Sequence, residues 1–131
     1  MFRARGYGGA GASARYRDID VASRVEGATP HGLVAILFDE LLKALEMLIV
    51  HQRQGDLARR NERQARALSI LHGLEASLDF DRGGEIANSL SQIYREARRL
   101  IALGVRDGDV APIEQARAML ADIAGAWTSI G

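Results

Sequence analysis

The chain has 131 residues, a formal net charge of zero and no cysteine. This length fits a single domain, and the lack of cysteine excludes disulfides, thiolate metal sites and cysteine catalysis. A zero net charge provides no global field that would draw the chain to nucleic acid or to an anionic membrane.

Residues 1–15 are rich in glycine, alanine and arginine. Such a segment cannot bury enough apolar surface to offset its chain entropy, so we predict a flexible N-terminal tail. It carries positive charge with no apolar run behind it, which is not the pattern of a secretory signal. Residues 16–28 are expected to form a short extra helix with Tyr16, Ile19 and Ala22 on one side.

Four longer helices are predicted over residues 29–131, at about 30–54, 57–79, 85–105 and 112–128. Thr29 can cap the first helix and Pro30 suits its first position, because the N–H that proline lacks is not needed there. Asp56 can cap the second, and Pro112 fits the first turn of the fourth. No strand alternation occurs, and the connections are short, so neighbouring helices should be antiparallel. We predict an all-α, antiparallel up-down four-helix bundle.

The first two of these helices carry more apolar residues than one buried face needs. On a helical wheel, Phe38, Leu41 and Leu45 mark the core face of the first helix, while Asp39 and Lys43 mark the opposite arc. Further apolar residues fall on the polar arc or at its edge, either as ordinary exposed side chains or as a groove for an amphipathic partner helix. These surplus residues are Leu33, Ile36, Leu37, Met47, Val50, Ile70 and Leu74.

The charged residues of the first helix are too many for a membrane span, so we expect a cytoplasmic protein. No glycine-rich phosphate loop follows a strand, and no Glu-x-x-His pair of the kind used by di-iron bundles occurs. We therefore expect no metal, no cofactor and no catalytic residue. Arg59, Arg63 and Arg66 form a basic ridge without interleaved aromatics, which indicates a solvated face or a contact for an acidic partner rather than nucleic acid.

His72 lies in LHGLEAS (residues 71–77), which resembles the His-x-Leu-Lys-Gly motif of histidine phosphotransfer domains. Those domains are also four-helix bundles, so phosphotransfer through His72 is the alternative function. Glu75 and Ala76 replace the lysine and glycine of the motif, and a carboxylate beside a phosphorylated imidazole would repel it. A histidine packed at the core edge is the favoured interpretation. A structural bundle that forms homodimers is a third possibility.

Three segments resemble the flagellin export chaperones called FliS. Residues 25–45, VEGATPHGLVAILFDELLKAL, are similar to that family's Val-x-Thr-Ala-Ser-Pro start and the helix after it. Residues 61–80, NERQARALSILHGLEASLDF, are similar to its Asn-x-x-x-x-Ala-x-x-Ile-x-x-Leu-x-x-Ser-Leu-Asp helix. Residues 83–103 carry a Gly-Glu-Ile-Ala-x-x-Leu-x-x-x-Tyr pattern, and Trp127 matches a closing tryptophan. The order and the intervals make the set specific, although Phe38 and Glu40 replace a tyrosine and a glycine.

The resemblance implies a non-enzymatic cytoplasmic chaperone that binds the disordered C-terminal segment of flagellin. It would prevent premature polymerisation and deliver flagellin to the flagellar type III secretion apparatus. The surplus apolar residues would then form the client-binding groove. The resemblance also implies an N-terminal lid over part of that groove, bearing Tyr16, Ile19 and Val25. A second partner, an export-gate component or a co-chaperone, could use the arginine ridge.

Overall fold

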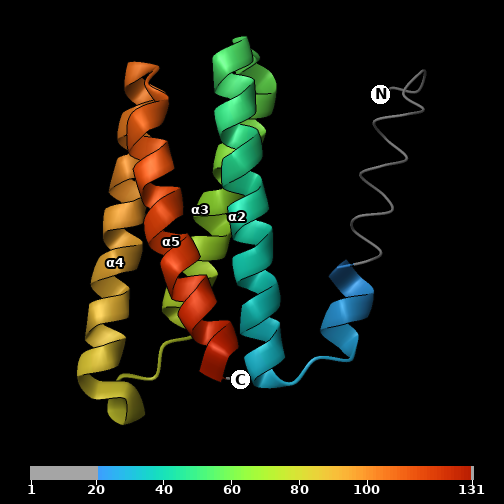
Figure 1. The fold of residues 1–131 in the computed structure, drawn as a ribbon, viewed down its shortest axis with the longest axis vertical. Helices are drawn as coiled ribbons and strands as arrows, with labels where there is room; N and C mark the ends of the chain where they lie inside the picture. The colour runs from blue at the N-terminus through green and yellow to red at the C-terminus, as the bar shows by residue number, and fades with distance from the viewer. Residues whose placement is uncertain (1–20, 131) are drawn as a thin grey trace.

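The computed structural model describes residues 21–130. Residues 21–26 are helical, and four long helices follow, α2 (Pro30–Gln54), α3 (Leu57–Ala76), α4 (Phe80–Asp107) and α5 (Val110–Ile130). The four alternate in direction (Figure 1), and no strand occurs among residues 21–130. The prediction of an all-α, antiparallel four-helix bundle is confirmed. The tail at 1–15, together with Tyr16 and Ile19, lies outside the described residues.

Two of the helices begin at the side-chain caps predicted from the sequence. The Thr29 hydroxyl oxygen accepts the Gly32 N–H at 3.0 Å, and Pro30 takes the first position of α2. The Asp56 carboxylate accepts the Arg59 N–H at 3.2 Å at the start of α3. Each cap satisfies a backbone donor that has no partner within its own helix.

The start of α4 differs from the predicted boundary near residue 85. Asp79 accepts the Arg82 N–H at 3.1 Å, so the helix begins at Phe80. Gly84 then adopts φ 50° and ψ −120°, which interrupts the helical geometry. A residue with a Cβ is strained in this region, which accounts for glycine at the kink. The regular part of α4 therefore follows a separate, capped first turn.

Two other boundaries also differ from the prediction. α3 ends at Ala76 instead of residue 79, where the Ser77 hydroxyl donates to the Leu74 carbonyl at 2.8 Å. α5 begins at Val110 instead of residue 112, because Asp109 accepts the Ala111 N–H at 3.0 Å. Pro112 still lies in the first turn, where a missing N–H costs no helical hydrogen bond.

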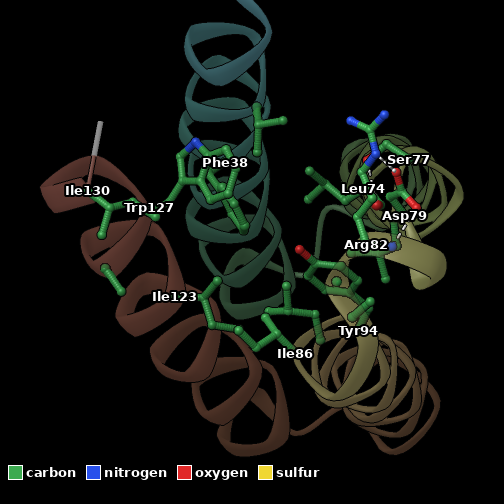
Figure 2. A pocket seen from close by; sticks show the side chains of 16 residues that line it. Phe38, Leu74, Ser77, Asp79, Arg82, Ile86, Tyr94, Ile123, Trp127 and Ile130 are labelled. Atoms are coloured by element: carbon green, nitrogen blue, oxygen red, sulfur yellow. Dashed lines mark hydrogen bonds and ion pairs between the residues drawn. The ribbon is translucent and has the colours of Figure 1, made fainter.

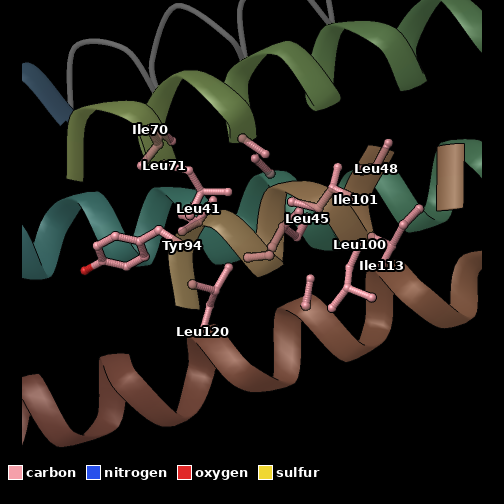
Figure 3. Packing of buried hydrophobic residues seen from close by; sticks show 14 of the residues in the cluster. Leu41, Leu45, Leu48, Ile70, Leu71, Tyr94, Leu100, Ile101, Ile113 and Leu120 are labelled. Atoms are coloured by element: carbon pink, nitrogen blue, oxygen red, sulfur yellow. The ribbon is translucent and has the colours of Figure 1, made fainter. Parts of the chain in front are cut away.

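The core runs along the axis of the bundle and draws on all four long helices (Figure 3). Leu41, Leu45 and Leu48 of α2 are fully enclosed, as are Ile113 and Leu120 of α5. α2 packs against α3 and α5, and α5 also packs against α4. The pair α3 and α4 closes the ring with the sparsest packing of the four neighbouring pairs.

Polar contacts strengthen that sparse pair. The Glu75 carboxylate of α3 accepts from Ser91 Oγ at 2.9 Å and Arg95 Nε at 3.1 Å, and lies 2.6 Å from Arg98 Nη1. Arg98 is the largest cause, followed by Ser91, of a fall in the pKa of Glu75 from 4.5 to about 2. A carboxylate held by several donors strongly favours its charged form, so Glu75 stays ionised and links the two helices.

Candidate functional site

An apolar cleft opens at the end of the bundle where α2 begins and α5 ends. α4 and α5 lie side by side at the turn that joins them and diverge toward this end (Figure 1). The cleft has a volume of about 550 Å³, within the range of pockets that hold ligands. We call it the end cleft. It is lined by Val34, Phe38, Leu74, Ser77, Leu78, Asp79, Arg82, Gly83, Ile86, Ala87, Leu90, Tyr94, Ile123, Ala126, Trp127 and Ile130.

The end cleft has a buried floor and an exposed apolar rim (Figure 2). Phe38 and Leu74 are buried in the floor. On the rim, Ile86 is 71% exposed and Ile130 is 74% exposed. Large apolar side chains exposed to this extent around a concave apolar surface are typical of an interaction site. The arrangement can bury apolar side chains of another segment, each contributing roughly 1.5–3 kcal/mol when fully enclosed.

The polar part of the rim is self-paired. Ser77, Asp79 and Arg82 lie together at the α3–α4 connection (Figure 2). Arg82 Nε lies 3.7 Å from Asp79 Oδ2, and the Ser77 hydroxyl is bonded to the Leu74 carbonyl. The remaining lining of the end cleft is therefore suited to uncharged groups, because an unpaired charge would lose its hydration there.

Trp127 forms one wall of the end cleft and joins α5 to α2. Its ring stacks on the His31 imidazole, with centroids 4.3 Å apart and planes inclined by 10°. Its indole N–H also donates to the His31 carbonyl at 3.0 Å. From the sequence, Trp127 is predicted only to close the bundle. Its role in shaping the cleft depends on how far α4 diverges from α5.

The surplus apolar residues do not form one continuous groove. Contrary to the wheel, Ile36 (7% exposed), Ile70 (8%) and Leu74 (1%) are buried. The wheel placed them on the outer arc or at its edge. α2 packs against α3 and α5, and α3 packs against α2 and α4, so the buried arc of each helix is wider than one stripe. Among the surplus residues, Leu74 alone lines the end cleft.

The other four surplus residues lie on α2. Leu37 and Met47 are half-buried, whereas Leu33 and Val50 are exposed. Met47 and Val50 line a separate shallow depression beside Lys43 and Glu46. Contact between these side chains and a client stays a prediction.

Of the three residues predicted to bear the lid contacts, only Val25 is among the described residues, and it is exposed. One residue before it, Arg24 Nη1 lies 3.5 Å from Asp39 Oδ2 of α2. Asp39 also pairs with Lys43 Nζ at 3.3 Å. These contacts tie the end of the short N-terminal helix to the outer face of α2.

His72 is exposed on α3, so the expectation of a histidine packed at the core edge is wrong. The described part of the chain contains no group of three or more His, Asp or Glu side chains able to hold a metal ion. No helix within residues 21–130 is long and apolar enough to cross a bilayer.

The arginine ridge is partly neutralised. Arg66 Nη2 lies 3.3 Å from Glu40 Oε1, and this carboxylate is buried beneath it. Arg59 Nε lies 3.7 Å from Asp56 Oδ2. Glu40 is one of the departures from the family pattern, and the bundle accommodates its charge through Arg66 and Lys43.

The profile of the family described as flagellar protein FliS matches residues 12–131. This chain belongs to the FliS family. The match spans all four long helices and every residue of the end cleft.

Named relatives agree with the FliS assignment. The flagellar secretion chaperone FliS of Salmonella typhimurium is 38% identical over 117 residues, covering 88% of this chain and 86% of the relative. The FliS chaperone of Escherichia coli K12 is 32% identical over 114 residues, covering 86% and 83%. That of Vibrio cholerae is 27% identical over 115 residues, covering 88% and 85%. The chain is therefore a flagellar export chaperone and not an enzyme, which leaves phosphotransfer through His72 without support.

Proposed function

We propose that this FliS protein binds the disordered C-terminal segment of flagellin in the cytoplasm. Binding would prevent premature polymerisation and would deliver flagellin to the flagellar type III secretion apparatus. The observation that carries the proposal is the end cleft, an apolar concavity with an exposed apolar rim in a member of a secretion-chaperone family. A disordered segment that orders its apolar face there would stay unable to polymerise yet remain releasable.

The rim of the end cleft allows a test that separates binding from folding. Ile86 is largely exposed on the rim, so Ile86→Asp should leave thermal unfolding unchanged. It should weaken flagellin binding by about tenfold or more, because a desolvated carboxylate would oppose an apolar partner. The matched control is Leu57→Asp. Leu57 is also a largely exposed apolar residue on a helix, but it lies at the opposite end of the bundle. Equal binding by the two variants would refute the role of the end cleft.

The surplus residues Leu33, Leu37, Met47 and Val50 are proposed as a second, shallower contact along α2. An extended client could continue from the end cleft along this face, since Met47 and Val50 already border a depression. An export-gate component or a co-chaperone is proposed for the arginine ridge, where Arg59 is paired only at the surface.

Residues 16–25 are proposed as a lid that competes with the client. The Arg24–Asp39 ion pair supports this role, because it returns the end of the segment to the bundle. A competing intramolecular contact would lower the apparent client affinity by the fraction of open molecules.

A further inference from the structure

The floor of the end cleft contains a tyrosine hydroxyl that has no partner among residues 21–130. Tyr94 of α4 is 3% exposed. Its hydroxyl makes no hydrogen bond with any residue in the described part of the chain. The hydroxyl is not among the fully enclosed unpaired polar atoms of the described bundle, so it is open to water in the cleft. An occupant that displaced this water without offering a partner would leave the hydroxyl unpaired, at a cost of roughly 1–3 kcal/mol. The hydroxyl is therefore a candidate contact for whatever occupies the cleft.

The direction of the side chain supports this role. Figure 2 shows the Tyr94 hydroxyl facing the space between Phe38, Leu74 and Ile86. Figure 3 shows the same hydroxyl pointing away from the core cluster in which the ring is packed. The ring thus serves the core, and the hydroxyl faces the cleft.

The surroundings define the chemistry of the missing partner. Burial raises the pKa of Tyr94, so the hydroxyl stays protonated at neutral pH and can donate or accept. Asp79 and Arg82, the charged residues lining the end cleft, pair with each other at the rim. A charged partner in the floor would thus be desolvated without a counter-ion. Within a helix the backbone groups are already bonded to one another, so the partner must be a side chain.

We propose that the Tyr94 hydroxyl is the polar anchor of the end cleft, where it hydrogen-bonds one neutral polar side chain on the apolar face of the client helix. That side chain would be a serine, threonine, asparagine or glutamine of the flagellin C-terminal segment. The inference rests on the proposed function and refines it, because a purely apolar helix would leave the hydroxyl unpaired. A site built around such a group discriminates against an occupant that lacks the matching partner.

The test uses Tyr94→Phe, which removes the hydroxyl and keeps the ring. The full-length variant should unfold at about the same temperature as wild type, because the ring is kept and the hydroxyl makes no hydrogen bond within the described part of the bundle. It should bind the flagellin C-terminal segment about three- to tenfold more weakly, the range expected for one net hydrogen bond. Thr128→Val is the control, since the Thr128 hydroxyl bonds only carbonyls of its own helix and does not line the cleft.

A double-mutant cycle identifies the partner. Each serine, threonine, asparagine and glutamine of the segment is replaced by alanine and titrated against wild type and Tyr94→Phe. One substitution should weaken binding to wild type and leave binding to Tyr94→Phe unchanged. The chain has only three tyrosines, so the Tyr94 ring resonance, which should shift when the segment binds, gives a second test without any variant.

The outcomes separate the two proposals. If wild type binds flagellin and Tyr94→Phe binds equally well or more tightly, the anchor is refuted while the proposed function stands. A Tyr94 resonance that does not shift on binding, or a cycle with no coupled position, also refutes the anchor. If wild type does not bind flagellin, the proposed function fails and the anchor fails with it.

Discussion

Trp127 and His31 are 96 positions apart in the sequence and form a stacked, hydrogen-bonded pair at the mouth of the end cleft. The stack and the indole hydrogen bond join the last turns of α5 to the first turn of α2. Within residues 21–130, no side-chain hydrogen bond or ion pair joins the first turns of α4 to α5 at this end. The cleft therefore lies between a fixed wall on one side and a kinked helix on the other.

His31→Ala removes the stack and leaves the backbone carbonyl that Trp127 bonds. Aromatic pairs contribute about 0.5–1.5 kcal/mol beyond their buried area, so the free energy of unfolding should fall by about that amount. Trp127 is the only tryptophan, and its emission should shift to longer wavelength as the ring gains solvent. His72→Ala, at an exposed position of α3, should change neither measurement. A similar loss of unfolding free energy in both variants would contradict a stabilising role for the Trp127–His31 pair.

Because of Glu75, the free energy of unfolding of the bundle should depend on pH in the acid range. Folding lowers the pKa of Glu75 from 4.5 to about 2, so its stabilisation is complete above about pH 4.5 and is lost as the pH falls toward about 2. Glu75→Gln should reduce the free energy of unfolding by about 2 kcal/mol at pH 7. In urea titrations from pH 7 to pH 2, the gap between wild type and variant should close. A gap that is constant with pH would show that the carboxylate charge does not stabilise the α3–α4 pair.

Gly104 permits a close approach between α4 and α5. A Cβ at this position would lie 2.6 Å from Ile113 Cγ1 and 2.7 Å from the Asp109 carbonyl oxygen. Gly104→Ala should therefore destabilise the bundle by about 1–3 kcal/mol through overpacking. Gly125→Ala is the matched control in α5, where a Cβ would meet nothing within 4 Å. It should stabilise the helix by up to about 1 kcal/mol. Thermal unfolding of both variants checks the opposite signs.

Deletion of residues 1–24 tests the lid. The deletion removes Tyr16 and Ile19 and also the Arg24–Asp39 pair. If the segment competes for the client surface, flagellin affinity should rise by about threefold or more. Arg24→Ala alone should give part of this gain. Unchanged or weaker binding by the deletion variant would contradict an inhibitory lid.

The sequence predicts the bundle well because the signals that start each helix and mark its buried face are local. Thr29 and Asp56 act through backbone N–H groups three residues away. The core leucines of α2 repeat at helical spacing, which identifies their face without knowledge of the neighbours. Local chemistry of this kind can be recognised in a single chain.

The site is less predictable because it depends on how far helices diverge. Ile86 and Leu90 belong to the apolar stripe of α4 and look like ordinary core residues. The kink at Gly84 and the spread of α4 from α5 leave that stripe without a partner at one end. Conversely, Ile70 looks surplus on a wheel and is buried, because α3 has neighbours on two sides. The paired glycines 83 and 84 were the available hint that α4 is not straight at its start.

The central claim is that this FliS protein is a chaperone for the C-terminal segment of flagellin. Its most direct test is calorimetric titration of the full chain with flagellin from the same organism, intact and lacking that segment. The account predicts binding to intact flagellin with a large negative heat-capacity change, because apolar surface is buried, and no binding to the truncated form. Equal binding to the two forms, or binding to neither, would contradict it.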